Sequence, residues 1–166
     1  MKILIAYICM CTTLVISMFA TAYADTKPAQ ITSIDDATLM QVKGIEQVMK
    51  TQFDKPEAPL KVFPVSVEGD YAVAGWMQKQ KGGRALLKKQ ASNWTILVCG
   101  GDGLRNAEVL IQTGMNASVA EALAKKVQQS ESKLSKQQLK QLSLFGGVVK
   151  VEAGQQHGAN TEHKAH

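Results

Sequence analysis

The chain has 166 residues, of which 45% are hydrophobic and 20% charged, and its formal net charge is +5 at pH 7. This length supports one domain with a proper core. The basic excess is modest and is spread in pairs such as Lys88-Lys89 and Lys125-Lys126, with no arginine cluster. Because a nucleic-acid-binding face is more densely basic, we expect no nucleic-acid partner.

The first residues predict export. One lysine precedes an apolar run from Ile3 to about Phe19, and the triplet AYA at 22–24 forms an A-x-A cleavage site. The run is slightly short for a membrane span, which needs roughly 20 apolar residues, and polar residues interrupt it. We therefore predict a signal peptide over residues 1–24, cleavage after Ala24, release into the periplasm and no stable membrane anchor afterwards.

The rest of the chain divides into three parts. Residues 25–33 are interpreted as a linker, residues 34–152 as a single α+β domain, and residues 153–166 as a disordered histidine-containing tail. Apolar residues at helical spacing predict an amphipathic helix over about 34–53. Gly44 weakens that helix, so we expect it to mark a close contact with the sheet.

Four short strand-like runs follow between Leu60 and Cys99, namely LKVFPVSV, YAVAGWMQK, GRALLKKQ and WTILVC. The segments EGD, QKGG and QASN separate them, and each is typical of a hairpin turn. Such short connections predict a four-stranded antiparallel meander. Pro64 in the first run indicates an edge strand or a bulge.

Helical spacing returns after Cys99. One helix is expected in GGDGLRNAEVLIQTGM, with Leu104, Ala107, Leu110 and Ile111 on its inner face. Ser118 and Glu121 predict a capping box for a second helix, and Ser135 predicts the cap of a third.

A last strand is expected in LFGGVVKVEAG, which completes the predicted architecture. The fold class is α+β, with an N-terminal helix, a four-stranded antiparallel meander, C-terminal helices and a final strand. We expect the helices on one face of the sheet, in a cystatin-like or nuclear-transport-factor-like arrangement.

The sequence lacks the residue combinations of the common enzyme active sites. Residues 34–152 contain no histidine, and therefore no Ser-His-Asp or Cys-His pair and no HExxH motif. The segment CGGDG at 99–103 is similar to phosphate-cradling loops, but it lacks the lysine and serine of a P-loop and the third glycine of a dinucleotide fingerprint. We interpret it as a tight turn, with Asp102 favoured by the dipole of the helix that follows, and we expect no enzyme.

Metal ligation has more support. His157, His163 and His166 are the three histidines of the chain, and imidazole suits copper, zinc and nickel. The alternative is that they stand in a solvated end. Cys99 is alone once Cys9 and Cys11 leave with the signal peptide, so it is a buried core residue, an intermolecular partner, or a residue kept for a metal or redox task. The methionines at 40, 49, 77 and 115 form no paired motif and are interpreted as core residues.

Several stretches together resemble a family of exported bacterial proteins named "copper uptake system-associated protein". They are FDKPEAPL at 53–60, YAVAGW at 71–76, GGRALL at 82–87, VCGGDGL at 98–104 and LSLFGGVVKVE at 142–152. The resemblance covers nearly the whole mature chain. It implies an accessory role beside a periplasmic copper chaperone or copper importer, and it brings no established ligand set.

The resulting hypothesis is a periplasmic, non-enzymatic accessory protein of copper uptake or handling, which binds copper weakly through its tail. Cys99 is the next candidate ligand, for copper(I), because it lies in one of the resembling stretches. Two alternatives stay open. One is a protein-interaction module that uses WMQKQKGGRALLKK as an exposed basic hairpin, and the other is a small-ligand pocket on a curved sheet.

Overall fold

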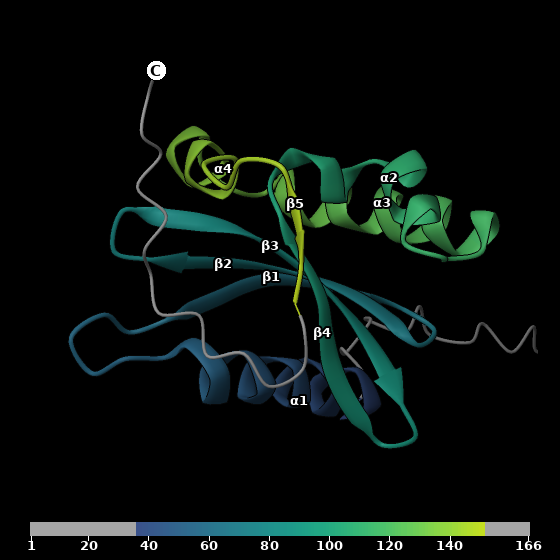
Figure 1. Cartoon of the computed structure of the whole chain (residues 1–166), viewed down its shortest axis with the longest axis horizontal. Helices are drawn as coiled ribbons and strands as arrows, with labels where there is room; N and C mark the ends of the chain where they lie inside the picture. The colour runs from purple at the N-terminus through teal and green to yellow at the C-terminus, as the bar shows by residue number, and fades with distance from the viewer. Residues whose placement is uncertain (1–35, 152–166) are drawn as a thin grey trace, which may run out of the picture. The chain divides into compact units, whose positions relative to one another are not determined.

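The computed structural model describes residues 36–151, which form a five-stranded antiparallel sheet with helices on both sides (Figure 1). The elements in chain order are α1 (Asp36–Phe53), β1 (Lys61–Glu68), β2 (Tyr71–Gln78), β3 (Lys81–Gln90), β4 (Asn93–Gly100), the 3-10 helix η1 (Asp102–Arg105), α2 (Ala107–Gln112), α3 (Ala117–Glu131), α4 (Lys136–Leu142) and β5 (Val148–Lys150). The predicted α+β class is confirmed, with its N-terminal helix, meander, later helices and last strand. The predicted signal peptide, linker and tail lie outside the described residues.

The meander follows from two-residue turns. Strands β1 to β4 are neighbours in chain order, and the pairs of residues at 69–70, 79–80 and 91–92 join them. The first residue of each turn, Gly69, Lys79 or Ala91, has a positive φ of 53–55°, which matches the twist of a tight hairpin. The prediction that QKGG forms a turn was wrong beyond Gln80, because Lys81, Gly82 and Gly83 belong to β3.

Close packing explains these two glycines. A Cβ at Gly82 would lie 2.6 Å from the backbone oxygen of Gln141, and one at Gly83 would lie 2.8 Å from Cβ of Phe145. Their missing side chains let α4 and the segment after it approach the sheet. Glycine thus permits a turn at one position, such as Gly69, and a close backbone contact at another, such as Gly82.

The prediction for Pro64 is confirmed. Strand β1 is an edge of the sheet, and its pairing with β2 is irregular between Val62 and Val65. Pro64 lies inside this irregularity, after a cis peptide bond with Phe63. A residue without an N–H is tolerated where the ladder is already interrupted.

Helices cover both faces of the sheet, contrary to the expectation of one covered face. Helix α1 packs on one face through Ile45 and Met49. A Cβ at Gly44 would lie 3.4 Å from Cδ1 of the Trp94 ring, so the predicted close contact of Gly44 with the sheet is confirmed. On the other face, η1, α2 and α3 pack on Val73, Leu86 and Val98 of the central strands. Strands β2 and β3 are buried in nearly continuous runs, and such runs require cover on both sides.

Local boundaries also correct the helix predictions. The helix expected in GGDGLRNAEVLIQTGM is divided into η1 and α2 by Asn106, whose φ and ψ of −106° and 130° are extended. Ile111 is 40% exposed and does not join the core. Helix α3 is capped by Asn116, whose Oδ1 accepts the N–H of Ser118, so the predicted cap at Ser118 was wrong.

The helix cap predicted at Ser135 is confirmed, and it takes the form of a capping box. The backbone N–H of Gln138 donates to Ser135 Oγ, and the backbone N–H of Ser135 donates to Gln138 Oε1. Between residues 36 and 151, no helix is long and apolar enough to cross a bilayer.

Candidate functional site

Cys99 lies on β4, where it is buried in the core that α1 covers. It pairs with Val149 of β5. Burial raises the pKa of its thiol from 9.0 to about 11, because an apolar surrounding disfavours the thiolate. A metal ligand must be the accessible thiolate, so the structure favours the interpretation of Cys99 as a core residue over its interpretation as a copper ligand.

The other predicted ligands do not meet Cys99 within the described residues. His157, His163 and His166 lie outside them. Met49, Met77 and Met115 are buried, as expected for core residues, whereas Met40 is 69% exposed. Residues 36–151 bring together no group of three histidine, cysteine, aspartate or glutamate side chains that could hold a metal ion.

The basic hairpin expected to dock a partner is not exposed as a whole. Arg84 is 0% exposed, and Lys88 lies over the ring of Tyr71 at the far end of the strand pair. Only Lys79 and Lys81 remain as exposed cations at the hairpin tip. The prediction that all the basic residues of this segment are exposed on one hairpin surface was therefore wrong.

A hollow lies between α2 and α3, with a volume of about 400 Å³. Its lining is mostly charged and polar: Asn106, Ala107, Glu108, Glu121, Ala124, Lys125 and Gln128. Small-molecule pockets are lined mainly by apolar and aromatic side chains. This hollow is not the apolar cavity that the small-ligand alternative requires.

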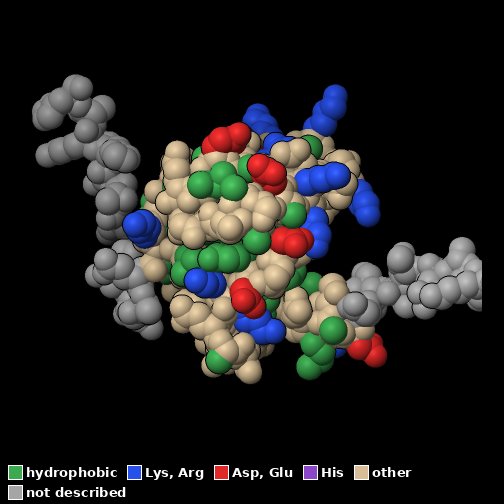
Figure 2. All heavy atoms as spheres, turned by 90° about the vertical axis from the view of Figure 1, so that its right-hand side faces the viewer, with side chains coloured by type: hydrophobic (Ala, Val, Ile, Leu, Met, Phe, Trp, Pro, Cys, Tyr) green, Lys and Arg blue, Asp and Glu red, His purple; other side chains and the backbone are tan. Residues whose placement is uncertain are grey.

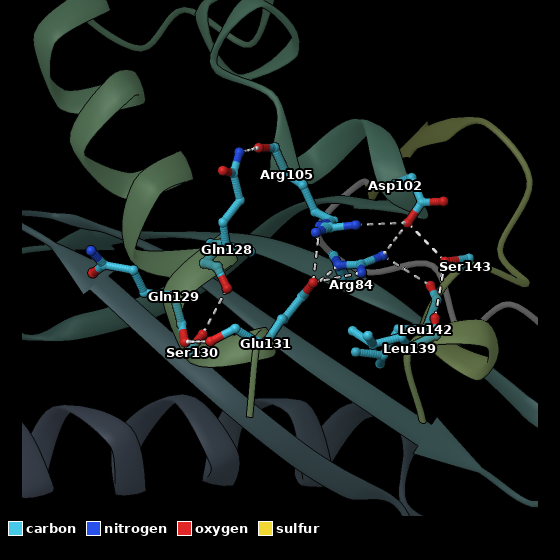
Figure 3. A network of polar contacts seen from close by, with 12 residues as sticks. Arg84, Asp102, Arg105, Gln128, Gln129, Ser130, Glu131, Leu139, Leu142 and Ser143 are labelled. Carbon is cyan, nitrogen blue, oxygen red and sulfur yellow. Dashed lines mark hydrogen bonds and ion pairs between the residues drawn. The ribbon is translucent and has the colours of Figure 1, made fainter. Parts of the chain in front are cut away.

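The most organised polar site in the described structure surrounds Arg84, which projects from β3 toward the C-terminal helices (Figure 3). Its Nε donates to Glu131 Oε1 at 2.6 Å and its Nη2 to Glu131 Oε2 at 2.9 Å. Its Nη1 donates to Asp102 Oδ1 at 3.2 Å and to the carbonyl oxygen of Leu142 at 3.1 Å. Four of the five guanidinium N–H groups thus have partners.

Two more side chains complete this group (Figure 3). The Nε of Arg105 lies 3.0 Å from Glu131 Oε2, although it lacks the alignment of a hydrogen bond. Ser143 Oγ lies 2.8 Å from Asp102 Oδ1 and donates there or to the carbonyl of Leu139. We call Arg84, Asp102, Arg105, Glu131 and Ser143 the arginine cluster.

The arginine cluster holds two guanidinium groups and two carboxylates, so its charges balance. Arg84 and Glu131 are 0% and 2% exposed, and burial of such a pair is tolerated only when both partners are well hydrogen-bonded. Both carboxylate oxygens of Glu131 face guanidinium nitrogens. The geometry makes the cluster a clamp that joins β3 to η1, α3 and α4.

Sequence reasoning missed this cluster, although two signals were present. Arg84 interrupts the apolar run of a central strand, and Glu131 follows Leu123 and Val127 at a spacing of four residues on the inner face of α3. A charged residue at a core position needs a partner. Three of the resembling stretches, GGRALL, VCGGDGL and LSLFGGVVKVE, supply Arg84, Asp102 and Ser143.

Comparison with known proteins adds no relative: the sequence matches no family model, and neither a curated protein nor a solved structure matches it significantly. The resemblance to copper uptake system-associated proteins therefore stays a prediction.

Proposed function

We propose that the protein is a non-enzymatic accessory factor of copper handling in the periplasm, whose copper ligands are the histidines of residues 153–166. The observation that supports this most is the distribution of ligand residues. All three histidines lie at 157–166, and the single cysteine of residues 36–151 is buried with a raised pKa. In this proposal, residues 36–151 do not bind the metal themselves, and the copper ligands lie in the segment that follows them.

The chemistry of the ligands suits copper(II). Neutral imidazole nitrogen is a favoured copper ligand, and copper(II) binds tightest among the first-row divalent ions. His157, His163 and His166 are separated by five and two residues, so a chain that folds back on itself can present all three to one ion. The resemblance also supports a periplasmic copper chaperone or copper importer as the partner.

The test is a calorimetric copper(II) titration of the mature chain and of a variant with His157→Ala, His163→Ala and His166→Ala. The proposal predicts that the variant loses the binding heat, while the control Gln155→Ala, Asn160→Ala, Thr161→Ala retains it. In the native chain, affinity must fall as pH drops through about 6.5, because protonated imidazole cannot ligate. Unchanged affinity of the histidine variant would overturn the proposal.

A further inference from the structure

Two segments that are far apart in the sequence form one basic surface at the end of the sheet. The tip of the β2–β3 hairpin carries Lys79 and Lys81, and α4 carries Lys136 and Lys140. The side chain of Gln141 joins them, since its Nε2 donates to the carbonyl oxygens of Lys79 at 2.9 Å and of Lys81 at 3.0 Å. Figure 1 shows α4 above this hairpin. We call the four lysines the lysine surface.

The lysine surface has no counter-charges of its own. Residues 71–101 and 132–151, which supply it, contain no aspartate or glutamate. Acidic residues approach this end from the segment after α1, where Asp54 and Glu57 adjoin Phe53 and Ala58, whose carbonyl oxygens accept from Gln78 Nε2. All four lysines are exposed, and none forms an ion pair with a carboxylate of residues 36–151.

The opposite end of the sheet differs. Figure 2 faces that end and shows acidic side chains among the basic ones. Lys126, for example, lies 2.7 Å from Glu68 and donates to the carbonyl oxygen of Val67. Lys50 and Lys126 thus have carboxylate partners within the described structure, whereas the four lysines of the lysine surface have none there.

We propose that the lysine surface binds an acidic segment of a partner protein. Opposite charge attracts and orients such a segment. Gln80 and Gln137 are exposed beside the lysines, and their amides can both donate to and accept from the peptide groups of a bound chain. The inference concerns a different surface from the proposed copper ligands, so either can fail without the other.

A protein partner fits better than a membrane or a nucleic acid. Leu144 is the exposed large apolar side chain next to α4, whereas surface helices that insert into a bilayer carry an apolar face. The surface also lacks arginine and exposed aromatic rings, which provide stacking in single-stranded nucleic-acid sites. An acidic peptide needs neither feature.

The experiment measures binding of a fluorescein-labelled peptide of alternating glutamate and glycine to the mature protein by anisotropy at low salt. The test variant carries Lys79→Gln, Lys81→Gln, Lys136→Gln and Lys140→Gln. The control carries Lys43→Gln, Lys89→Gln, Lys125→Gln and Lys150→Gln, which removes the same charge from positions outside the hairpin tip and α4. Loss of four exposed charge contacts is expected to weaken the test variant about tenfold and the control less than about twofold.

Amide chemical shifts of the native protein localise the site without any substitution. We expect the peptide to shift the amides around 79–82 and 133–142, and added salt to reverse the shifts because it screens exposed charges. Absence of binding, equal loss in both variants, or shifts centred on other elements overturns the proposal. So does preferential binding of phosphatidylglycerol vesicles or of a DNA oligonucleotide that the same four substitutions abolish.

Discussion

The two faces of the sheet are closed in different ways. On the α1 face, the core is formed by apolar side chains, with Ile45 and Met49 packed against strand residues such as Leu87. On the other face, an apolar core around Leu123 is continued by the arginine cluster, in which Arg84 is as buried as any core residue.

The two faces therefore contribute differently: the α1 face mainly stabilises the fold, and the arginine cluster mainly determines where the helices of the other face lie. Apolar contacts reward any close packing of a helix on a sheet, so the α1 face needs little more than a correctly spaced helix. Arg84 finds all its partners only when η1, α3 and the end of α4 converge on it. An unpartnered buried charge is costly, so the cluster fixes the positions of these elements.

The largest effect is expected from Glu131→Ala, which leaves the Arg84 guanidinium buried with Asp102 as its remaining charged partner. Removal of one member of a buried pair costs about 3–5 kcal/mol, measured as the free energy of unfolding in urea. Glu108→Ala, at an exposed position of α2, is the control and should change stability by less than about 0.5 kcal/mol. The double variant Arg84→Met, Glu131→Leu should recover much of the loss; equal loss in the single and double variants contradicts the pairing.

On the apolar face, Ile45→Ala should cost about 2–5 kcal/mol, because it leaves a cavity at a fully buried position. Met40→Ala in the same helix removes a side chain that is 69% exposed and serves as the control. Combining Ile45→Ala with Glu131→Ala sharpens the comparison, since the sheet separates the two sites and their effects should add within about 0.5 kcal/mol. Strong non-additivity would show that the faces are not independent.

Cys99 tests the closure of the α1 face by reactivity. A pKa raised from 9.0 to about 11 lowers the thiolate fraction at pH 8 about hundredfold, so alkylation of the native protein should be slower than that of the urea-unfolded chain by at least this factor. The raised pKa also predicts that stability from this group is present below pH 9 and is lost as the pH rises toward 11. Native and unfolded rates within about tenfold of each other would disprove the burial of the thiol.

The smallest effect is expected from Gly83→Ala, which tests the approach of the last segment to β3. The new Cβ would meet Cβ of Phe145 at 2.8 Å and the carbonyl oxygen of Gly100 at 3.0 Å, which should cost about 1–3 kcal/mol. At Gly146 nothing lies within 4 Å of an added Cβ, so Gly146→Ala should be nearly neutral. A neutral Gly83→Ala in thermal unfolding would argue against this contact.

Spacing in the sequence was enough to predict the meander, α1 and the helix cap at Ser135, because each depends on residues close together in the chain. It was not enough for the cover on both faces or for the arginine cluster. Arg84 and Glu131 are separated by 47 residues, and no local pattern pairs them. Gly82 and Gly83 were taken for a turn because a glycine that permits a backbone contact looks the same in sequence as one that permits a turn.

We propose that copper is held outside residues 36–151, by the histidines at 157–166. Paramagnetic copper(II) broadens the amide resonances closest to it, so its addition to the isotope-labelled mature protein locates the ion directly. We predict the earliest loss of signal at His157, His163 and His166, with little change in β2, β3 and α3. Earliest loss in β4 and β5 around Cys99, or anywhere else in residues 36–151, would contradict it.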